Sequence, residues 1–126
     1  MKILLVDDDQ GYLNVLGDIL RQEGHEVLAA ENGKQARENI EYEPVDLIIS
    51  DVFMPTLDGA RFHSYVREFT DAHDVPFVFI SGHDDETTRR LIIDPEKDYF
   101  FSKTAPIESL VKFIGGLKRR ERKSSR

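Results

Sequence analysis

Five polar residues of this chain follow directly after short apolar segments, and their chemical types suit metal binding and phosphoryl transfer. Asp7 and Asp8 follow the first segment, Asp51 the third, Ser81 the fourth and Lys103 the fifth. Carboxylates that lie close together repel each other, and a hard divalent cation such as Mg²⁺ relieves this repulsion through oxygen ligands. A carboxylate beside such a cation can act as a nucleophile and form an aspartyl phosphate. A hydroxyl and an ammonium group could then hold the phosphoryl oxygens.

The apolar segments that precede these residues predict a parallel β-sheet. Three of the segments are almost continuously apolar, which is typical of strands covered on both faces. The predicted strands are residues 2–6, 27–30, 46–50, 76–80 and 99–102.

The segments between the strands carry apolar residues at helical spacing. The stripes are Leu13, Leu16, Ile19 and Leu20; Ala36 and Ile40; Phe62, Tyr65, Val66 and Phe69; and Ile107, Leu110, Val111, Ile114 and Leu117. A weaker helix is expected over residues 84–93, before Pro95. Asp9, Asn32 and Asp58 are predicted as N-caps. The aromatic side chains of the stripes are expected in the core.

Alternating strands and helices predict right-handed βαβ units. The expected fold is a doubly wound α/β domain with a five-stranded parallel sheet in the flavodoxin-like order 2-1-3-4-5 and helices on both faces. Ligands of such sheets bind at the carboxyl ends of the strands. The five polar residues are therefore expected to converge on that edge.

Length and composition limit the class of protein. The 126 residues suit one domain, and the absence of cysteine excludes disulfides and thiolate metal sites. No apolar run approaches the roughly 18–20 residues of a membrane span, and the N-terminus lacks the apolar region of a secretory signal. We therefore expect a cytoplasmic protein that does not enter a membrane. The four histidines have no zinc-site spacing and are expected at the surface or in local hydrogen bonds.

Charge is distributed unevenly along the chain. The last ten residues carry a net charge of +5, which leaves −12 on the other 116. An acidic body argues against nucleic acid as the main ligand of this domain. We place a globular domain at residues 1–118 and a basic tail, or the start of a linker, at 119–126. The tail has three interpretations: a solvated helix end, a linker to a second domain, or a contact with nucleic acid or another acidic surface.

The polar residues and their surroundings resemble the receiver domain of response regulators, the CheY-like family of two-component signal transduction. The start, ILLVDDD at residues 3–9, and the segment DVFMPTLDG at residues 51–59 resemble the family's acidic start and its D-x-x-M-P-x-x-D-G loop. Ser81 and Lys103 follow in the family's order. The resemblance covers residues 1 to about 118.

The resemblance implies a phosphoacceptor and a metal site. Asp51 would accept the phosphoryl group. Asp8 would bind Mg²⁺ directly, Asp7 would assist, and the backbone carbonyl of Phe53 would be a further ligand. A large apolar side chain at Phe53 is also expected to slow attack by water on the phosphoryl group.

The resemblance to receiver domains also implies switch residues and partner proteins. Ser81 would move to the phosphoryl group, Lys103 would pair with it, and Phe100 would hold the aromatic switch position. A sensor histidine kinase or a phosphotransfer protein would donate the phosphoryl group, and an effector protein or a fused output domain would read the changed surface. Dimerisation on phosphorylation stays open, and no direct nucleic-acid contact by this domain is expected.

One segment departs from the family pattern. The family usually has proline after the lysine, often with a cis peptide bond, but Thr104 follows Lys103 here. A cis bond before a non-proline residue costs about 2.5–4 kcal/mol. The Lys103–Thr104 bond is therefore either a strained cis bond or a trans bond in a rearranged loop, which would affect where Lys103 points.

The leading functional hypothesis is a phosphorylation-controlled signalling switch that is not an enzyme beyond its own phosphorylation and dephosphorylation. One alternative is a pseudo-receiver that binds partners without being phosphorylated, supported only by the altered loop after Lys103. Another is a Mg²⁺-dependent phosphohydrolase, which the sequence disfavours because Phe53 stands where such an enzyme needs a second acid or base. No glycine-rich phosphate-binding motif is present.

Overall fold

The computed structural model describes the backbone of residues 1–54, 57–82 and 89–124 and the side chains of these residues up to Leu117. The strands are β1 (Lys2–Val6), β2 (Glu26–Ala30), β3 (Leu47–Asp51), β4 (Phe77–Ser81) and β5 (Asp98–Ser102). The helices are α1 (Gln10–Gln22), α2 (Gly33–Tyr42), α3 (Gly59–Phe69) and α5 (Ile107–Ser124). The weak helix expected over residues 84–93 lies largely outside the described residues.

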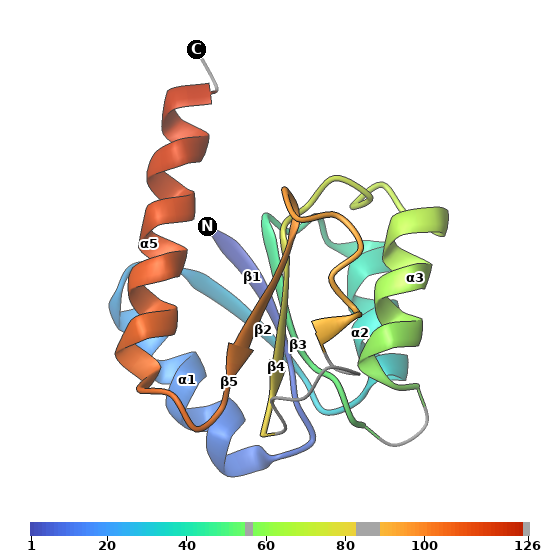
Figure 1. Ribbon diagram of the computed structural model, residues 1–126, viewed down its shortest axis with the longest axis horizontal. Coiled ribbons are helices and arrows are strands. Elements are labelled where there is room, and N and C mark those ends of the chain that lie inside the picture. The colour runs from blue at the N-terminus through green and yellow to red at the C-terminus, as the bar shows by residue number, and fades with distance from the viewer. Residues whose placement is uncertain (55–56, 83–88, 125–126) are drawn as a thin grey trace.

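The five strands form one parallel sheet in the order β2-β1-β3-β4-β5, as the sequence predicted. In Figure 1, α1 and α5 lie on one side of the sheet, and α2 and α3 lie on the other. β1 pairs with both β2 and β3 and is therefore an interior strand, and helices on both sides of the sheet cover its side chains. Because all five strands are parallel, their carboxyl ends lie at one edge of the sheet, and the helices begin at that edge.

Alternate strand residues enter two separate apolar cores. Ile3, Leu5 and Ile49 pack toward α1 and α5, whereas Leu4 and Ile48 pack toward α2 and α3. This division follows from the two-residue repeat of a strand, which points successive side chains to opposite faces. It explains why the central strands carry runs of consecutive apolar residues.

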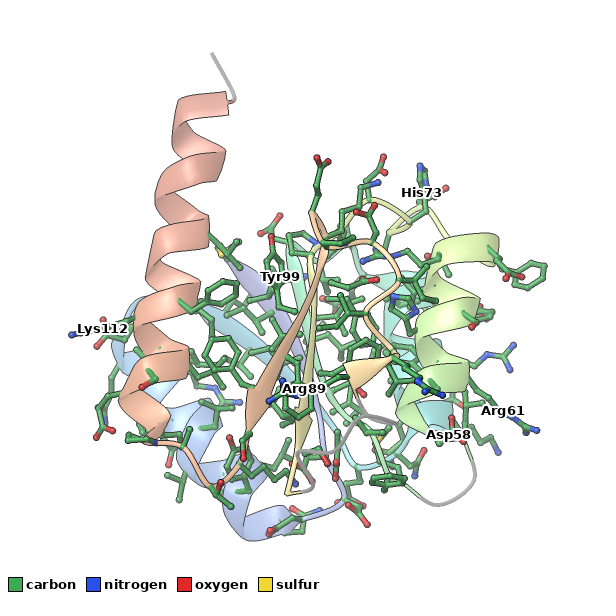
Figure 2. All side chains as sticks on the ribbon, in the orientation of Figure 1. Asp58, Arg61, His73, Arg89, Tyr99 and Lys112 are labelled. Carbon is green, nitrogen blue, oxygen red and sulfur yellow. The ribbon has the colours of Figure 1, made fainter. Side chains whose placement is uncertain are left out.

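The predicted N-caps are confirmed. The carboxylate of Asp9 accepts the backbone N–H of Tyr12, and Asn32 and Asp58 do the same for Gln35 and Arg61. Figure 2 labels Asp58 at the start of α3. Each cap satisfies one of the free N–H groups in the first turn of its helix.

The last helix projects past the sheet in Figure 1. Leu117 is buried and is the last residue whose side chain the structure describes, and the α5 backbone remains helical through Ser124. The division into a domain at residues 1–118 and a basic tail stays a prediction. Along the described chain, no helix combines the length and the apolar character needed to cross a membrane.

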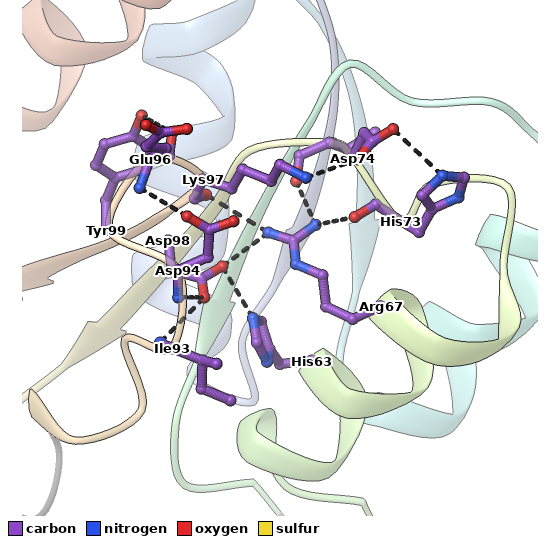
Figure 3. Close-up of polar contacts among 11 residues, drawn as sticks. His63, Arg67, His73, Asp74, Ile93, Asp94, Glu96, Lys97, Asp98 and Tyr99 are labelled. Atoms are coloured by element: carbon purple, nitrogen blue, oxygen red, sulfur yellow. Dashed lines mark hydrogen bonds and ion pairs between the residues drawn. The ribbon is translucent and has the colours of Figure 1, made fainter.

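A buried polar cluster joins α3 to the start of β5 (Figure 3). Oδ1 of Asp98 lies 2.7 Å from Nη2 of Arg67 and 2.9 Å from Nε2 of His63. Oδ2 of the same carboxylate accepts the backbone N–H groups of Ile93 and Asp94. Arg67 also donates to the carbonyls of His73 and Val75, so these contacts hold both segments that flank β4 to α3.

Two expectations about side-chain burial were wrong. Phe69, expected in the core with the rest of its stripe, is 73 % exposed at the end of α3. His63, expected at the surface or in a local bond, is only 3 % exposed and is bonded to a residue 35 positions away. His25 is buried as well, next to the N-terminal amine.

Candidate functional site

The polar residues singled out in the sequence all lie at the carboxyl edge of the sheet. Asp51 is the last residue of β3 and Ser81 the last residue of β4. Asp7 directly follows β1, and Lys103 directly follows β5. The local reason is the same for each: the apolar strand ends there, and the polar side chains meet one another at the edge of the sheet instead of entering the apolar core.

Three carboxylates come together at this edge. Asp7, Asp8 and Asp51 each place one oxygen within 4.8 Å of the others. Asp7 is fully buried and Asp51 is 7 % exposed, whereas Asp8 faces solvent. Two buried carboxylates side by side repel each other unless a cation lies between them.

Lys103 is the cation that the protein itself supplies. Its Nζ lies 2.7 Å from Oδ2 of Asp7 and 3.2 Å from Oδ2 of Asp51. The approach to Asp51 is a hydrogen bond, but the approach to Asp7 lacks hydrogen-bond geometry, so Oδ2 of Asp7 has a neighbouring charge and no donor. The peptide bond after Lys103 is trans, and the rearranged loop still directs the ammonium group into the carboxylate cluster.

The electrostatics of Asp51 are unusual for an aspartate. Burial, followed by the charge of Asp7, raises the pKa of Asp51 to about 6, although Lys103 acts in the opposite direction. Burial alone would lower the pKa of Lys103, but its close approach to Asp7 and the negative charges of Asp7 and Asp51 outweigh burial and raise it. The site therefore holds more negative charge than one lysine neutralises.

The donor set fits a hard divalent cation. The three residues offer carboxylate oxygens, which are the ligands that Mg²⁺ prefers, and one of these oxygens is buried without a hydrogen-bond donor. Mg²⁺ keeps several of its waters, so one or two carboxylates are enough to bind it. The acidic cluster is thus suited to Mg²⁺ by charge, by ligand type and by partial access to solvent.

Ser81 and Phe53 lie next to Asp51. Ser81 is 1 % exposed and lies one residue beyond Ile80, which pairs with Asp51 across the sheet. The backbone N–H of Phe53 lies 3.4 Å from Oδ1 of Asp51, while its ring is 56 % exposed. Phe100, the predicted aromatic switch residue, lies partly buried in β5 and packs against the core that α2 and α3 cover.

A glycine makes the loop after Asp51 fit against the strand. A Cβ at Gly59 would overlap the backbone carbonyl of Asp51, so only glycine allows α3 to begin this close to the strand end. Asp58 caps the same helix. The start of α3 is therefore packed directly on the backbone of the candidate acceptor residue.

Sequence reasoning missed Tyr12. Its ring lies in the first turn of α1, with Nζ of Lys103 at 5.0 Å from the ring centroid, so it contributes a cation–π contact to the site. Burial raises the pKa of Tyr12. The only signal in the sequence was that Tyr12 lies three residues after the N-cap Asp9. Many helices have a residue at this position that takes no part in a functional site.

The sequence of this chain is similar to those of known proteins. Residues 3–115 match the sequence model of the response regulator receiver domain. The chain is 31 % identical over 120 residues to response regulator RR06 of Streptococcus pneumoniae, covering 95 % of this chain and 54 % of that protein. It is 33 % identical over 119 residues to the transcriptional regulatory protein CpxR of Klebsiella pneumoniae, covering 94 % of this chain and 50 % of that protein. The chain thus spans about half the length of these curated relatives.

Solved structures show the same fold. The chemotaxis protein CheY4 of Vibrio cholerae superposes with a TM-score of 0.83 at 25 % identity, over 90 % of this chain and 95 % of that one. The receiver domain of the Francisella response regulator 1452 superposes with a TM-score of 0.84 at 24 % identity, over 95 % and 98 % of the two chains, which supports the fold. These comparisons lend no support to the pseudo-receiver alternative. By its sequence, its fold and the residues at its carboxyl edge, this chain belongs to the response regulator receiver domain family.

Proposed function

We propose that this chain is a signalling switch controlled by phosphorylation of Asp51. The observation that carries the proposal is the arrangement of Asp51 beside Asp7 and Lys103, with Asp8 at the open side. A carboxylate oxygen of Asp51 would bond to phosphorus while the bond from phosphorus to the donor's leaving atom breaks, and the leaving atom would keep the electron pair. From a phosphohistidine that leaving atom is a ring nitrogen.

The residues that would hold Mg²⁺ are Asp7, Asp8, Asp51 and the backbone carbonyl of Phe53. When bound, Mg²⁺ supplies positive charge that lets the carboxylates stay ionised and stabilises the phosphoryl oxygens. Lys103 would hold a phosphoryl oxygen from the other side, because its Nζ already lies 3.2 Å from Asp51. The raised pKa of Asp51 supports this role, since a group with such a pKa gains from added positive charge.

Ser81 and Phe100 would report the phosphorylation to the surface. Phosphorylation adds nearly two negative charges beside the end of β4, where the Ser81 hydroxyl can hydrogen-bond the phosphoryl group. The new contact favours one of two pre-existing arrangements, and Phe100 on the neighbouring strand would change its burial with it. The changed surface would then bind its partner differently.

The partners follow from this chemistry. A sensor histidine kinase or a phosphotransfer protein would supply the phosphoryl group, and an effector or a fused output domain would read the result. Such a chain is a signalling module and turns over no separate substrate. We propose a cytoplasmic location, where Mg²⁺ and such kinases meet.

The direct test is the intact mass of the protein after incubation with acetyl phosphate and Mg²⁺. Wild type should gain one phosphoryl group, and Asp51→Asn or excess EDTA should abolish the gain. Asp58→Asn is the matched control, because it changes an aspartate in the same loop that caps α3. A folded wild type that gains no phosphoryl group, or an Asp51→Asn variant that still gains one, would contradict the proposal.

A further inference from the structure

A groove runs between α2 and α3, on the side of the sheet away from α1 and α5. Two hollows of about 430 and 370 Å³ share Arg37 and Leu57 in their linings and so form one continuous depression. α3 has 11 residues, which at 1.5 Å per residue gives the groove a length of about 16 Å. That length matches about three turns of a helix.

The floor of the groove is apolar and aromatic. Phe69 is 73 % exposed, and its ring stacks on Tyr65 at a centroid distance of 6.1 Å. Leu57 and Ala60 are half-buried beside them. A single exposed apolar residue is ordinary, but a contiguous patch in a groove marks an interaction surface.

The rim of the groove carries three cationic side chains. Lys34, Arg37 and Arg61 are exposed, and among residues 1–54, 57–82 and 89–117 no carboxylate forms an ion pair with them. Arg37 instead lies over the ring of Tyr65, with its guanidinium carbon 4.1 Å from the ring centroid. This contact keeps the guanidinium group at the groove and leaves its N–H groups free to bind an anion.

One of the two glutamates at the groove is already engaged. Glu41 accepts the hydroxyl of Tyr65, whereas Glu38 is the other lining carboxylate. The three cations and two carboxylates of the lining give it a net charge of +1, on a body whose first 116 residues carry −12. Such a local reversal of sign selects a partner with complementary charge.

We propose that the groove between α2 and α3 is a docking surface for a helix of a partner protein that presents aliphatic side chains flanked by carboxylates. The aliphatic side chains would cover Leu57, Ala60 and Phe69, and the carboxylates would pair with Arg37 and Arg61. Aromatic and arginine side chains in a hollow are the common energetic centres of such interfaces. A polyanion such as nucleic acid fits less well, because the acidic body repels it and the apolar floor offers it nothing.

The test uses a fluorescein-labelled synthetic helix of about 16 residues, with leucines on one face and glutamates beside them. Fluorescence anisotropy should show saturable binding to the full chain, and a peptide with lysine for glutamate should not bind. Amide shifts in ¹⁵N-labelled protein should concentrate on α2 and α3. Asp51→Asn should bind as wild type does, so the result does not depend on the proposed phosphorylation.

Two substitutions test the groove and one controls for charge. Phe69→Ser and Arg61→Glu should each weaken binding about tenfold, with unchanged thermal stability because both side chains are exposed. Lys112→Glu, on α5 at the opposite side in Figure 2, should bind as wild type. Equal binding of both peptides, or both groove variants binding within twofold of wild type, would overturn the proposal. So would a concentration-dependent dimer or a duplex DNA complex that these variants abolish, because the groove would then belong to a second copy or to nucleic acid.

Discussion

At the scale of single residues, Asp51 combines a chemical role with a cost in stability. Its neighbour Asp7 is fully buried, and the one lysine between them serves both carboxylates. An aspartate with a raised pKa is held in its charged form at neutral pH against the preference of its surroundings. Residues of this kind are expected where function, not stability, selects the side chain.

The first prediction concerns the stability of Asp51→Asn without metal. Because the folded pKa of about 6 lies above the ordinary value of 3.8, the charged carboxylate destabilises the fold above pH 6, and the penalty vanishes as pH falls below both values. Asp51→Asn should therefore be more stable than wild type by about 1–3 kcal/mol at pH 7.5 in EDTA. Urea denaturation at pH 7.5 and pH 4 measures this. A gain that is equally large at pH 4 would show that charge is not its cause.

The second prediction separates the neighbours of Asp51. Lys103 lowers the pKa of Asp51 and Asp7 raises it, although burial is the largest influence. Lys103→Met should move the Asp51 pKa above 6, and Asp7→Asn should move it below 6. Carboxyl ¹³C titrations of the metal-free protein give these values, with Lys112→Met as the control on the far helix. A Lys103→Met titration that overlays wild type would show that this ammonium group does not act on Asp51.

At the scale of elements, the cluster of His63, Arg67 and Asp98 joins α3 to β5. The Asp98 side chain is fully buried, and burial alone would raise its pKa, but Arg67, a backbone N–H of Asp94 and His63 together lower it. Burial lowers the pKa of His63, with Asp98 partly opposing this. Nε of Arg67 is buried without a partner, so the cluster is well paired at Asp98 but incomplete at Arg67.

The third prediction is that Asp98→Asn destabilises the protein strongly. The substitution keeps the shape but removes the charge that Arg67 faces in a largely buried place, and such a loss costs about 3 kcal/mol. Asp74→Asn is the matched control, because Asp74 pairs with Lys97 at the exposed surface, and it should change stability little. Chemical denaturation of both variants measures their free energies of unfolding against wild type. Similar midpoints for the two would mean that the buried cluster contributes no more than a surface pair.

The fourth prediction is a pH dependence that belongs to His63. The unfolded histidine takes up a proton near its ordinary pKa of about 6.5, whereas the buried His63 resists protonation. The unfolded state therefore binds more protons, and stability should fall as pH falls from 7.5 to 5.5. Asp51 has the opposite slope in this range, so the comparison is made in the Asp51→Asn background. In that background, His63→Leu should reduce the loss of stability between pH 7.5 and pH 5.5, as measured by urea denaturation at both pH values. An equal loss with and without His63 would mean that other groups cause the pH dependence.

At the scale of the whole molecule, the binding edge is built from the carboxyl ends of β1, β3, β4 and β5. Each side chain that would hold Mg²⁺ is therefore tied to the packing of the sheet, and the set exists only in the folded chain. A cation that binds the folded state and not the unfolded chain stabilises it by mass action.

The fifth prediction follows from this linkage. Mg²⁺ at about one hundred times its dissociation constant should stabilise wild type by about 2.7 kcal/mol. The effect should be much smaller in Asp8→Asn and in Asp51→Asn, while Asp58→Asn should respond as wild type does. Thermal unfolding monitored by circular dichroism, with and without Mg²⁺, provides the measurement. A shift that survives in Asp8→Asn and in Asp51→Asn would place the stabilising cation elsewhere.

Patterns within single segments determined the elements of this protein. The apolar runs predicted all five strands. The first prediction has the observed bounds, and each of the other four differs by a single residue at one or both ends. The caps Asp9, Asn32 and Asp58 marked the starts of three helices. Strand and helix periodicity and capping are local properties, and a chain segment carries them before it packs. For the same reason, the sequence placed the five polar residues at the ends of strands.

Only the tertiary structure decided how these segments meet. It directs Lys103 to both Asp7 and Asp51, despite the missing proline after it, and so determines the raised pKa of Asp51. It also leaves Phe69 exposed beyond the edge of the core and buries His63 against Asp98. These outcomes depend on distances between residues far apart in the chain. Helical spacing shows which residues share a face, but the length of the neighbouring elements decides how much of that face is covered.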